Sequence, residues 1–302
     1  GKMDLISIRR KYRNIRNIII AISILVLVII FGLVIKELNK KSKYQKVYTS
    51  YENQIKQLQG GQQEGEEHKT QEQKEAEKKT KLPQLTQEGK SNLENIYHSD
   101  TKRVFLTFDD GPSETVTPVV LDTLKKENIK ATFFLLGSRV ELNPELVKRE
   151  YNEGHYLASH GYSHVYSQIY ASPQSVIDEY NRSVTAIRNA IGEQQYNPHL
   201  FRFPGGYWGG KYAEVKKQAK QLLDENDILH IDWNALTSDA AGAKTTEQFI
   251  AELEKTVPKH NSVVVLMHDA GNKQATANAL PTIIKYFRDK GFEFENFYSI
   301  IK

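Results

Sequence analysis

Short apolar runs alternate with longer amphipathic stretches from about residue 96 to the end of the chain. The apolar runs predict strands at Val104–Phe108, Ala131–Leu136, His155–Ser159, Leu200–Phe203, Ile228–Trp233 and Val263–Met267, with a weaker one at Phe292–Phe297. The stretches between them predict helices at Val116–Glu127, Pro144–Glu153, Pro173–Ile191, Tyr212–Asn226, Thr246–Val257 and Ala277–Lys290. Repeated strand–helix units imply a mostly parallel sheet with helices outside it. About seven units predict an α/β fold, a distorted and incomplete (β/α) barrel, with a doubly wound sheet as the alternative.

An uncharged apolar run, Ile18–Ile35, precedes this region and is 18 residues long. A transmembrane helix needs roughly 17–25 such residues, so the run predicts a membrane span. A cleaved signal peptide is the rival interpretation, but no small-residue cleavage site follows the run. We therefore expect a single-pass anchor with the folded region outside the cell. The basic residues that precede the run favour an N-terminus inside: Arg9, Arg10, Lys11, Arg13 and Arg16.

The segment that joins the apolar run to the folded region is polar. A weak heptad spacing over residues 44–58 fits either a short coiled coil or a juxtamembrane helix, and residues 62–89 are rich in Gln, Glu and Lys. Such a composition buries too little apolar surface to fold. The predicted organisation is a cytoplasmic basic segment (1–17), a transmembrane helix (18–35), a helical or disordered polar linker (36–95) and a folded domain (96–302).

Composition narrows the possible chemistry. The formal net charge of +4 is too weak and too dispersed to indicate nucleic-acid binding. The chain has no cysteine, which excludes a disulfide framework and a thiolate metal site. Any bound metal must therefore take its ligands from His, Asp and Glu.

Two adjacent carboxylates, Asp109 and Asp110, follow the first predicted strand and precede Gly111. Neighbouring side chains on a strand point to opposite faces, so the pair converges on one site only if the backbone turns there. Two close carboxylates repel, and both stay ionised only beside a cation or an arginine. A simple turn that ends a strand is the structural alternative.

His160 and His164 follow the third predicted strand at a spacing that brings both imidazoles to one face of a helical turn. Two histidines and a carboxylate, with one position left for water, form a catalytic metal arrangement. Such a pair in isolation is more often found on surface loops. Because the carboxyl ends of barrel strands meet, we expect Asp109 and Asp110 nearby, and the set predicts a metal site.

Further polar residues follow the later strands. Arg202 ends the fourth strand, where an arginine would orient a neighbouring carboxylate, and the N–H of Gly205 after Pro204 is suited to stabilising an oxyanion. Asp239 follows the fifth strand and His268 the sixth, where a histidine is suited to protonating a leaving amine. Each of these, alone, is a common structural feature.

Three aromatic residues, Tyr207, Trp208 and Trp233, come just past strand ends. They predict a stacking platform for a sugar ring, and ordinary core packing is an equal alternative.

Together these residues resemble the polysaccharide deacetylase family, the nodulation-type deacetylase domain of the carbohydrate esterases. Within it, the chain resembles membrane-anchored bacterial peptidoglycan N-acetylglucosamine deacetylases. The resemblance spans roughly residues 100–302, and its motifs come in the family's order. Four of them are Thr107-Phe108-Asp109-Asp110-Gly111, Ser159-His160 to His164, Arg202-Phe203-Pro204 and Leu266-Met267-His268. The set is specific, although no single motif is.

The resemblance implies a distorted barrel and a divalent metal, usually zinc, with Co²⁺, Ni²⁺ and Mn²⁺ as alternatives. Asp109 would be the general base, oriented by Arg202, and His268 the general acid, partnered by Asp239. The Gly205 N–H would stabilise the oxyanion. The metal ligands would be Asp110, His160 and His164. The expected substrate contacts are Tyr207, Trp208, Trp233 and Leu266.

The implied reaction is hydrolysis of N-acetyl groups on a polysaccharide, which releases acetate. An anchor and a long tether suit a polymer fixed outside the cell, so peptidoglycan is the predicted substrate. Chitin-like oligomers, exopolysaccharide and acetylxylan are alternatives within the family, and a catalytically silent wall-glycan-binding module is the alternative from another class. The catalytic domain is expected to be extracellular and monomeric.

Two positions depart from the family's pattern. Many members have an Asp-Trp pair where this chain has Asp239-Ala240, and many have tyrosine where it has Gly205. Both changes predict a more open groove wall and leave the metal chemistry in place.

Overall fold

The computed structural model describes residues 13–36, 38–39 and 82–301. In the N-terminal unit, Arg13–Lys36 forms one helix that contains the predicted run Ile18–Ile35. Its length and apolar composition fit a membrane span and equally a signal sequence. The weak heptad at 44–58 and most of the predicted linker lie outside the described residues.

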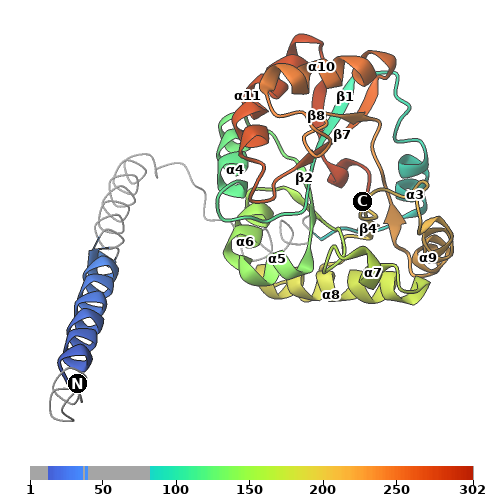
Figure 1. The fold of residues 1–302 in the computed structure, drawn as a ribbon. Coiled ribbons are helices and arrows are strands. Elements are labelled where there is room, and N and C mark those ends of the chain that lie inside the picture. Colours follow the sequence, from blue (N-terminus) through green and yellow to red (C-terminus); the bar gives the residue numbers. More distant parts are fainter. Residues whose placement is uncertain (1–12, 37, 40–81, 302) are drawn as a thin grey trace, which may run out of the picture. The chain divides into compact units, whose positions relative to one another are not determined.

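Eight parallel strands form the sheet in the described part of the C-terminal unit (Figure 1). They are β1 (Arg103–Asp109), β2 (Thr132–Leu135), β3 (Tyr156–Ser159), β4 (Leu200–Phe201), β5 (Leu229–His230), β6 (Ala235–Leu236), β7 (Ser262–His268) and β8 (Glu293–Glu295). The order across the sheet is β5-β4-β3-β2-β1-β7-β6. β8 pairs with Arg103–Phe105 of β1. β2 pairs with the later residues of β1, Thr107–Asp109, on the same side of the strand.

The sheet curls into a distorted barrel through one extended segment. β5 pairs with β4 at one edge of the sheet, and β6 pairs with β7 at the other. Only residues 231–234 separate β5 from β6, and so few residues span at most about 18 Å. The two edges therefore lie close together, which confirms the predicted barrel and excludes an open doubly wound sheet. The single predicted strand Ile228–Trp233 is wrong in its extent, because only Leu229–His230 within it pair with β4, and the next paired residues, Ala235–Leu236, join β7 instead.

Asn234 bridges the point where the chain changes partner. Its Oδ1 accepts the N–H of Val264 at 2.8 Å, and its Nδ2 donates to the carbonyl of Ser262 at 2.9 Å. A side chain thus supplies the ladder bonds to β7 just before β6 begins.

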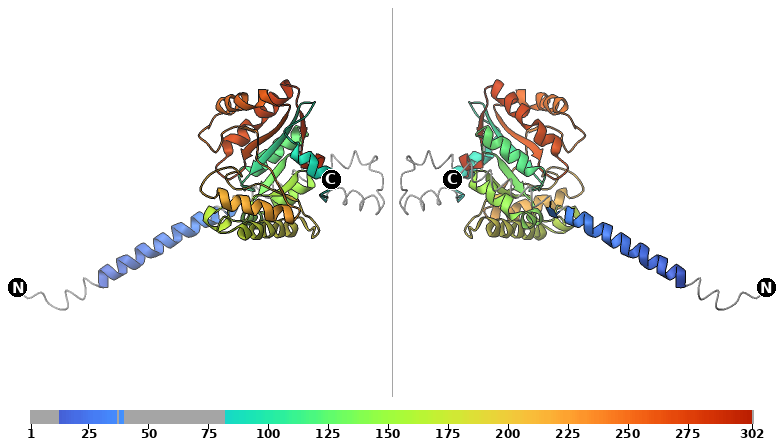
Figure 2. Two further views of the ribbon diagram at one scale, coloured as in Figure 1. Left: turned by 90° about the vertical axis from the view of Figure 1, so that its right-hand side faces the viewer. Right: turned by 90° about the vertical axis from the view of Figure 1, so that its left-hand side faces the viewer.

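Helices surround the curled sheet (Figures 1 and 2). Six of them match predicted helices closely: α4 (Thr117–Lys126), α6 (Pro144–Asn152), α8 (Pro173–Ile191), α9 (Ala213–Glu225), α10 (Thr246–Thr256) and α11 (Gln274–Asp289). Three have no predicted counterpart: α3 (Gln87–Glu94), α5 (Gly137–Leu142) and α7 (Tyr166–Ile169). These three are short, so they contain too few apolar repeats for a periodic signal. Two 3₁₀ turns, Val257–Lys259 and Phe297–Ser299, complete the described elements.

α3 lies within the segment predicted to be a polar linker. Thr86 caps its N-terminus, and its Leu93 is buried with Ile96 in an apolar cluster that includes Phe105 and Ile300. Leu85 and Tyr97 also pack against this cluster, so these apolar residues of the segment contact the barrel interior and the C-terminus. The packed structure therefore begins before residue 96.

β1 shows how the two faces of the sheet are used. Leu106 and Phe108 pack in the cluster shared with the surrounding helices, whereas Phe105 belongs to the cluster inside the barrel. Because the side-chain period of a strand is two, Thr107 and Asp109 share the interior face with Phe105. On this face of β1 the apolar Phe105 is therefore followed, toward the carboxyl end, by the polar Thr107 and Asp109.

We predict that Asn234→Ala lowers the stability of the barrel. It leaves the N–H of Val264 and the carbonyl of Ser262 without partners, and each such loss costs roughly 1–3 kcal/mol. Thermal unfolding should show a lower Tm, by roughly 2–4 °C per kcal/mol. Asn226→Ala, which removes an exposed side chain bonded to the Leu222 carbonyl at the end of α9, is the control and should change Tm much less. Equal Tm values for both variants would contradict this role of Asn234.

Candidate active site

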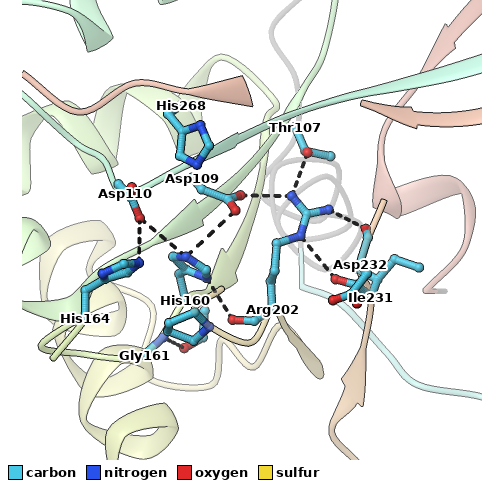
Figure 3. Close-up of polar contacts among 12 residues, drawn as sticks. Thr107, Asp109, Asp110, His160, Gly161, His164, Arg202, Ile231, Asp232 and His268 are labelled. Atoms are coloured by element: carbon cyan, nitrogen blue, oxygen red, sulfur yellow. Dashed lines mark hydrogen bonds and ion pairs between the residues drawn. The ribbon is translucent and has the colours of Figure 1, made fainter. Parts of the chain in front are cut away.

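The polar residues predicted at strand ends meet at one end of the barrel (Figure 3). The register of β1 and β7 places Asp109 opposite His268. β3 and β4 end directly before His160 and Arg202. Since all the strands are parallel, their carboxyl ends form one rim, which is where α/β barrels carry their active sites.

The backbone turns at Asp110, whose φ of +73° lies in the left-handed region. Because of this turn, the Asp110 carboxylate lies near Asp109 rather than on the opposite face of the strand (Figure 3). Its Oδ1 is 3.4 Å from Nε2 of His160 and 3.4 Å from Nε2 of His164. Ligand atoms of these three side chains all lie within 4.8 Å of one another. Asp109 stands further back, with Oδ2 3.8 Å from Nε2 of His160.

Asp110, His160 and His164 fit a divalent cation. Asp110 Oδ1 is buried without a hydrogen-bond donor among the described residues. Nδ1 of His160 lies 2.8 Å from the Arg202 carbonyl, which can only accept, so Nδ1 carries the proton and Nε2 is free to bind a metal. Burial alone would raise the pKa of Asp110, but the adjacent histidines, His160 above all, bring that pKa well below its usual range. An ionised carboxylate beside two imidazoles is a suitable ligand set.

Arg202 is fully buried and fixes Asp109. Its Nη1 donates to Asp109 Oδ1 at 2.9 Å and to the Thr107 hydroxyl at 2.7 Å. Its Nε and Nη2 donate to the carbonyls of Ile231 and Asp232 at 3.1 and 2.8 Å. Each guanidinium nitrogen therefore has an acceptor, which compensates the loss of hydration of the charge.

His268 forms a second charged pair at the rim. Its Nδ1 is 2.8 Å from Asp239 Oδ1, its backbone N–H donates to Asp239 Oδ2, and the Thr276 hydroxyl donates to the same oxygen. Burial alone would lower the pKa of His268, but the Asp239 hydrogen bond and the charges of Asp239, Asp109 and Asp110 raise it to about 9. The ring is therefore protonated at neutral pH, and it lies beside Asp109 and Asp110 (Figure 3).

Gly205 is exposed, has a φ of +80°, and its N–H makes no hydrogen bond to another described residue. A Cβ at this position would lie 2.6 Å from the hydroxyl oxygen of Tyr166, so the Tyr166 side chain occupies the adjoining space. The Tyr166 ring also lies 5.6 Å from the His164 ring, measured between centroids. No sequence motif points to Tyr166, and its side chain partly fills the opening predicted at Gly205.

The predicted aromatic platform is divided between two places. Trp208 is 82 % exposed and packs edge-on against Tyr207, with the two ring centroids 4.9 Å apart. Trp208 and Tyr97 both line a pocket of about 410 Å³. A separate cleft of about 980 Å³ adjoins Asp110, and Ala240 lies in its lining. Trp208 does not line that cleft.

Trp233 and Leu266 lie closer to the charged network. The Arg202 guanidinium is 5.6 Å from the centre of the Trp233 ring, and a Cβ at Gly206 would lie 3.0 Å from that ring. Leu266 is half-buried and, by the period of β7, shares a face with His268.

These features define an α/β-barrel protein with a candidate divalent-metal centre between a buried aspartate and a charged histidine. Residues 97–222 match the model of the polysaccharide deacetylase family. The chain is 38 % identical over 193 residues to the peptidoglycan-N-acetylglucosamine deacetylase PgdA of Listeria monocytogenes, which covers 64 % of this chain and only 37 % of that protein. It is 35 % identical over 204 residues to a peptidoglycan-N-acetylglucosamine deacetylase of Bacillus cereus, covering 66 % of this chain and 70 % of that one.

The fold comparison agrees with the sequence comparison. A Streptococcus mutans CE4 esterase has a similar structure, with a TM-score of 0.63 and 31 % identity over 72 % of this chain and 96 % of that one. The chain therefore belongs to the polysaccharide deacetylase family, and the resemblance drawn from its motifs is confirmed.

The distances in the metal group generate a prediction that separates two adjacent residues. Asp110→Ala should bind metal more weakly, because it removes the carboxylate that faces both histidines, and excess metal should partly restore activity. Asp109→Asn should keep its metal and stay inactive at any metal concentration. Metal content measured on purified protein, together with a metal titration of activity, checks both. Metal loss in Asp109→Asn with retention in Asp110→Ala would mean that the two roles are exchanged.

Proposed function

We propose that this protein hydrolyses N-acetyl groups on a cell-wall or extracellular polysaccharide, with N-acetylglucosamine of peptidoglycan as substrate and acetate as product. One observation carries the proposal. Asp110, His160 and His164 lie within 4.8 Å of one another, beside an arginine-bound Asp109 and an aspartate-bound His268. The names of the Listeria and Bacillus relatives support the choice of substrate.

Asp110, His160 and His164 would hold the metal. Zn²⁺ suits two imidazoles and one carboxylate with an open position, and Co²⁺, Ni²⁺ or Mn²⁺ accept the same donors. When bound, the metal would polarise the acetamido carbonyl and acidify a water molecule.

Asp109 is the general base in this proposal. Arg202 holds its Oδ1, and Oδ2 remains to take a proton from the attacking water. The Gly205 N–H, which has no acceptor among the described residues, would stabilise the negative charge on the carbonyl oxygen.

His268 is the general acid. Asp239 binds its Nδ1, so the remaining ring proton, on Nε2, is the one available to the departing amine. An amine leaves poorly unless it is protonated, which is why the raised pKa of His268 suits the role. The products are acetate and a glucosamine-type amine.

The substrate would contact Leu266 and Trp233 near the charged network and Tyr207 and Trp208 further out. The cleft beside Asp110, with Ala240 in its lining, would admit a branched or peptide-bearing glycan. Chitin-like oligomers, exopolysaccharide and acetylxylan are alternative substrates that need the same chemistry. A silent wall-glycan-binding module is the alternative without catalysis.

The apolar helix Arg13–Lys36 would anchor the protein in the cell membrane. In this proposal it is uncleaved and single-pass, with the N-terminus inside and a monomeric catalytic domain outside. An extracellular location would bring the domain to its polymer.

Incubating the full chain in detergent with purified peptidoglycan tests the substrate. We expect acetate release that a chelator abolishes and added divalent metal restores. Chitin oligomers and acetylated xylan are the comparison substrates. Acetate release from either of these but not from peptidoglycan would overturn the substrate assignment, and binding of glycan without acetate release would indicate the silent module.

The His268–Asp239 pair predicts how activity falls at alkaline pH, that is, the alkaline limb of the plot of kcat/KM against pH. A general acid must be protonated, so kcat/KM should fall as pH rises through the pKa of His268, which is about 9. Asp239→Asn removes the strongest influence that raises this pKa, so the limb should move to lower pH by roughly 1–3 units. Thr276→Val removes a bond to Asp239 without touching the ring and should move it much less. An unmoved limb in Asp239→Asn would exclude His268 as the acid.

A further inference from the structure

The two histidines of the metal group lie on one short loop, residues 160–164, which contains two residues with positive φ. Gly161 has a φ of +81° and His164 a φ of +57°. Positive φ is uncommon for a residue other than glycine and persists where surrounding contacts impose it. His160 has its own restraint in the Arg202 carbonyl, but His164 depends on the conformation of the loop.

The carboxylate of Glu179, on α8, binds this loop at three points. Its Oε2 accepts the backbone N–H of Tyr162 at 2.8 Å and that of Ser163 at 3.0 Å, and its Oε1 accepts the Ser163 hydroxyl at 2.5 Å. A Cβ on Gly161 would lie 3.0 Å from Oε2, so glycine permits the close approach. Hydrogen bonds to a carboxylate are stronger than those between neutral groups.

The loop is thereby held between two helices. The N–H groups of Gly137 and Ser138, in the first turn of α5, donate to the carbonyls of Gly161 and Tyr162. Glu179 binds the other side of the loop, in the two residues directly before His164. Glu179 lies within α8, a 19-residue helix whose N-terminus is capped by Ser172.

We propose that Glu179 is a positioning residue that preforms the 160–164 loop and so places the His164 imidazole against Asp110 for metal binding. This inference rests on the proposed metal-dependent function. Without Glu179, the loop would have to be ordered by the metal itself, and the entropy of ordering would weaken binding. Glu179 touches neither metal nor substrate, so its loss should act on metal affinity rather than on the chemistry of the loaded site.

The test compares Glu179→Ala and Glu179→Gln with a control, Glu141→Gln, in the full chain. Glu141 accepts a hydrogen bond from the hydroxyl of Tyr162 on the same loop but does not bind its backbone. Zn²⁺ affinity is measured by competition with a chelator, and the Co²⁺ absorption spectrum reports the ligand geometry. We expect Glu179→Ala to bind Zn²⁺ roughly 10–100-fold more weakly, as outer-shell substitutions do. Glu179→Gln should be intermediate, and Glu141→Gln unchanged.

At saturating metal, acetate release by the Glu179 variants should approach that of the unaltered protein. Circular dichroism and unfolding in the presence of chelator check that the variants fold. If Glu179→Ala is misfolded, the comparison of Glu179→Gln with Glu141→Gln decides the question. Equal Zn²⁺ affinities for the Glu179 and Glu141 variants would overturn the inference, while acetate release by the unaltered protein would leave the proposed function standing. An unaltered protein that binds no metal would defeat both.

Discussion

The buried ion pair between Arg202 and Asp109 is the interaction on which the rest of the site depends. The two side chains are 0 % and 3 % exposed, so both charges are buried. Breaking such a pair by removing one partner typically costs roughly 3–5 kcal/mol, because the other charge is left buried alone. Here the guanidinium also binds Thr107 on β1 and two carbonyls of the segment between β5 and β6. One side chain therefore joins β1 to β4 and to the segment that closes the barrel.

The position of Arg202 explains why the interior face of β1 changes from apolar to charged toward the carboxyl end of the strand. The interior face of β1 runs from Phe105 through Thr107 to Asp109, one residue in every two. Phe105 packs in an apolar cluster to which α3 and the C-terminal residues also contribute, whereas Asp109 forms an ion pair with Arg202. The Asp109 charge is tolerated in this buried position because the arginine supplies its partner.

The other ionisable groups at the rim are also held by partners from elsewhere in the chain. The Arg202 carbonyl sets the tautomer of His160, and Asp239 orients and charges His268. The two carboxylates of Asp109 and Asp110 coexist because an arginine lies beside one and histidines beside the other. Oriented groups of this kind need little reorganisation during a reaction, which is the physical basis of catalysis by a preformed site.

The sequence alone determined the repeated strand–helix units, the parallel sheet and the motif residues at the strand ends, because these depend on local periodicity and residue type. Only the tertiary structure decided that the run at 228–233 pairs with β4 through Leu229–His230 alone, and that the chain joins β7 further on, at Ala235–Leu236. It likewise decided that α3 packs through Leu93 within a polar stretch. It also decided that Trp208 lies away from the Asp110 cleft and that Tyr166 fills the space beside Gly205. Glu179 is one acidic residue among many on amphipathic helices, and nothing local marks it. Its proposed role follows from the backbone groups of the 160–164 loop that it binds. These groups are distant in sequence and come together only when the helices pack around the barrel.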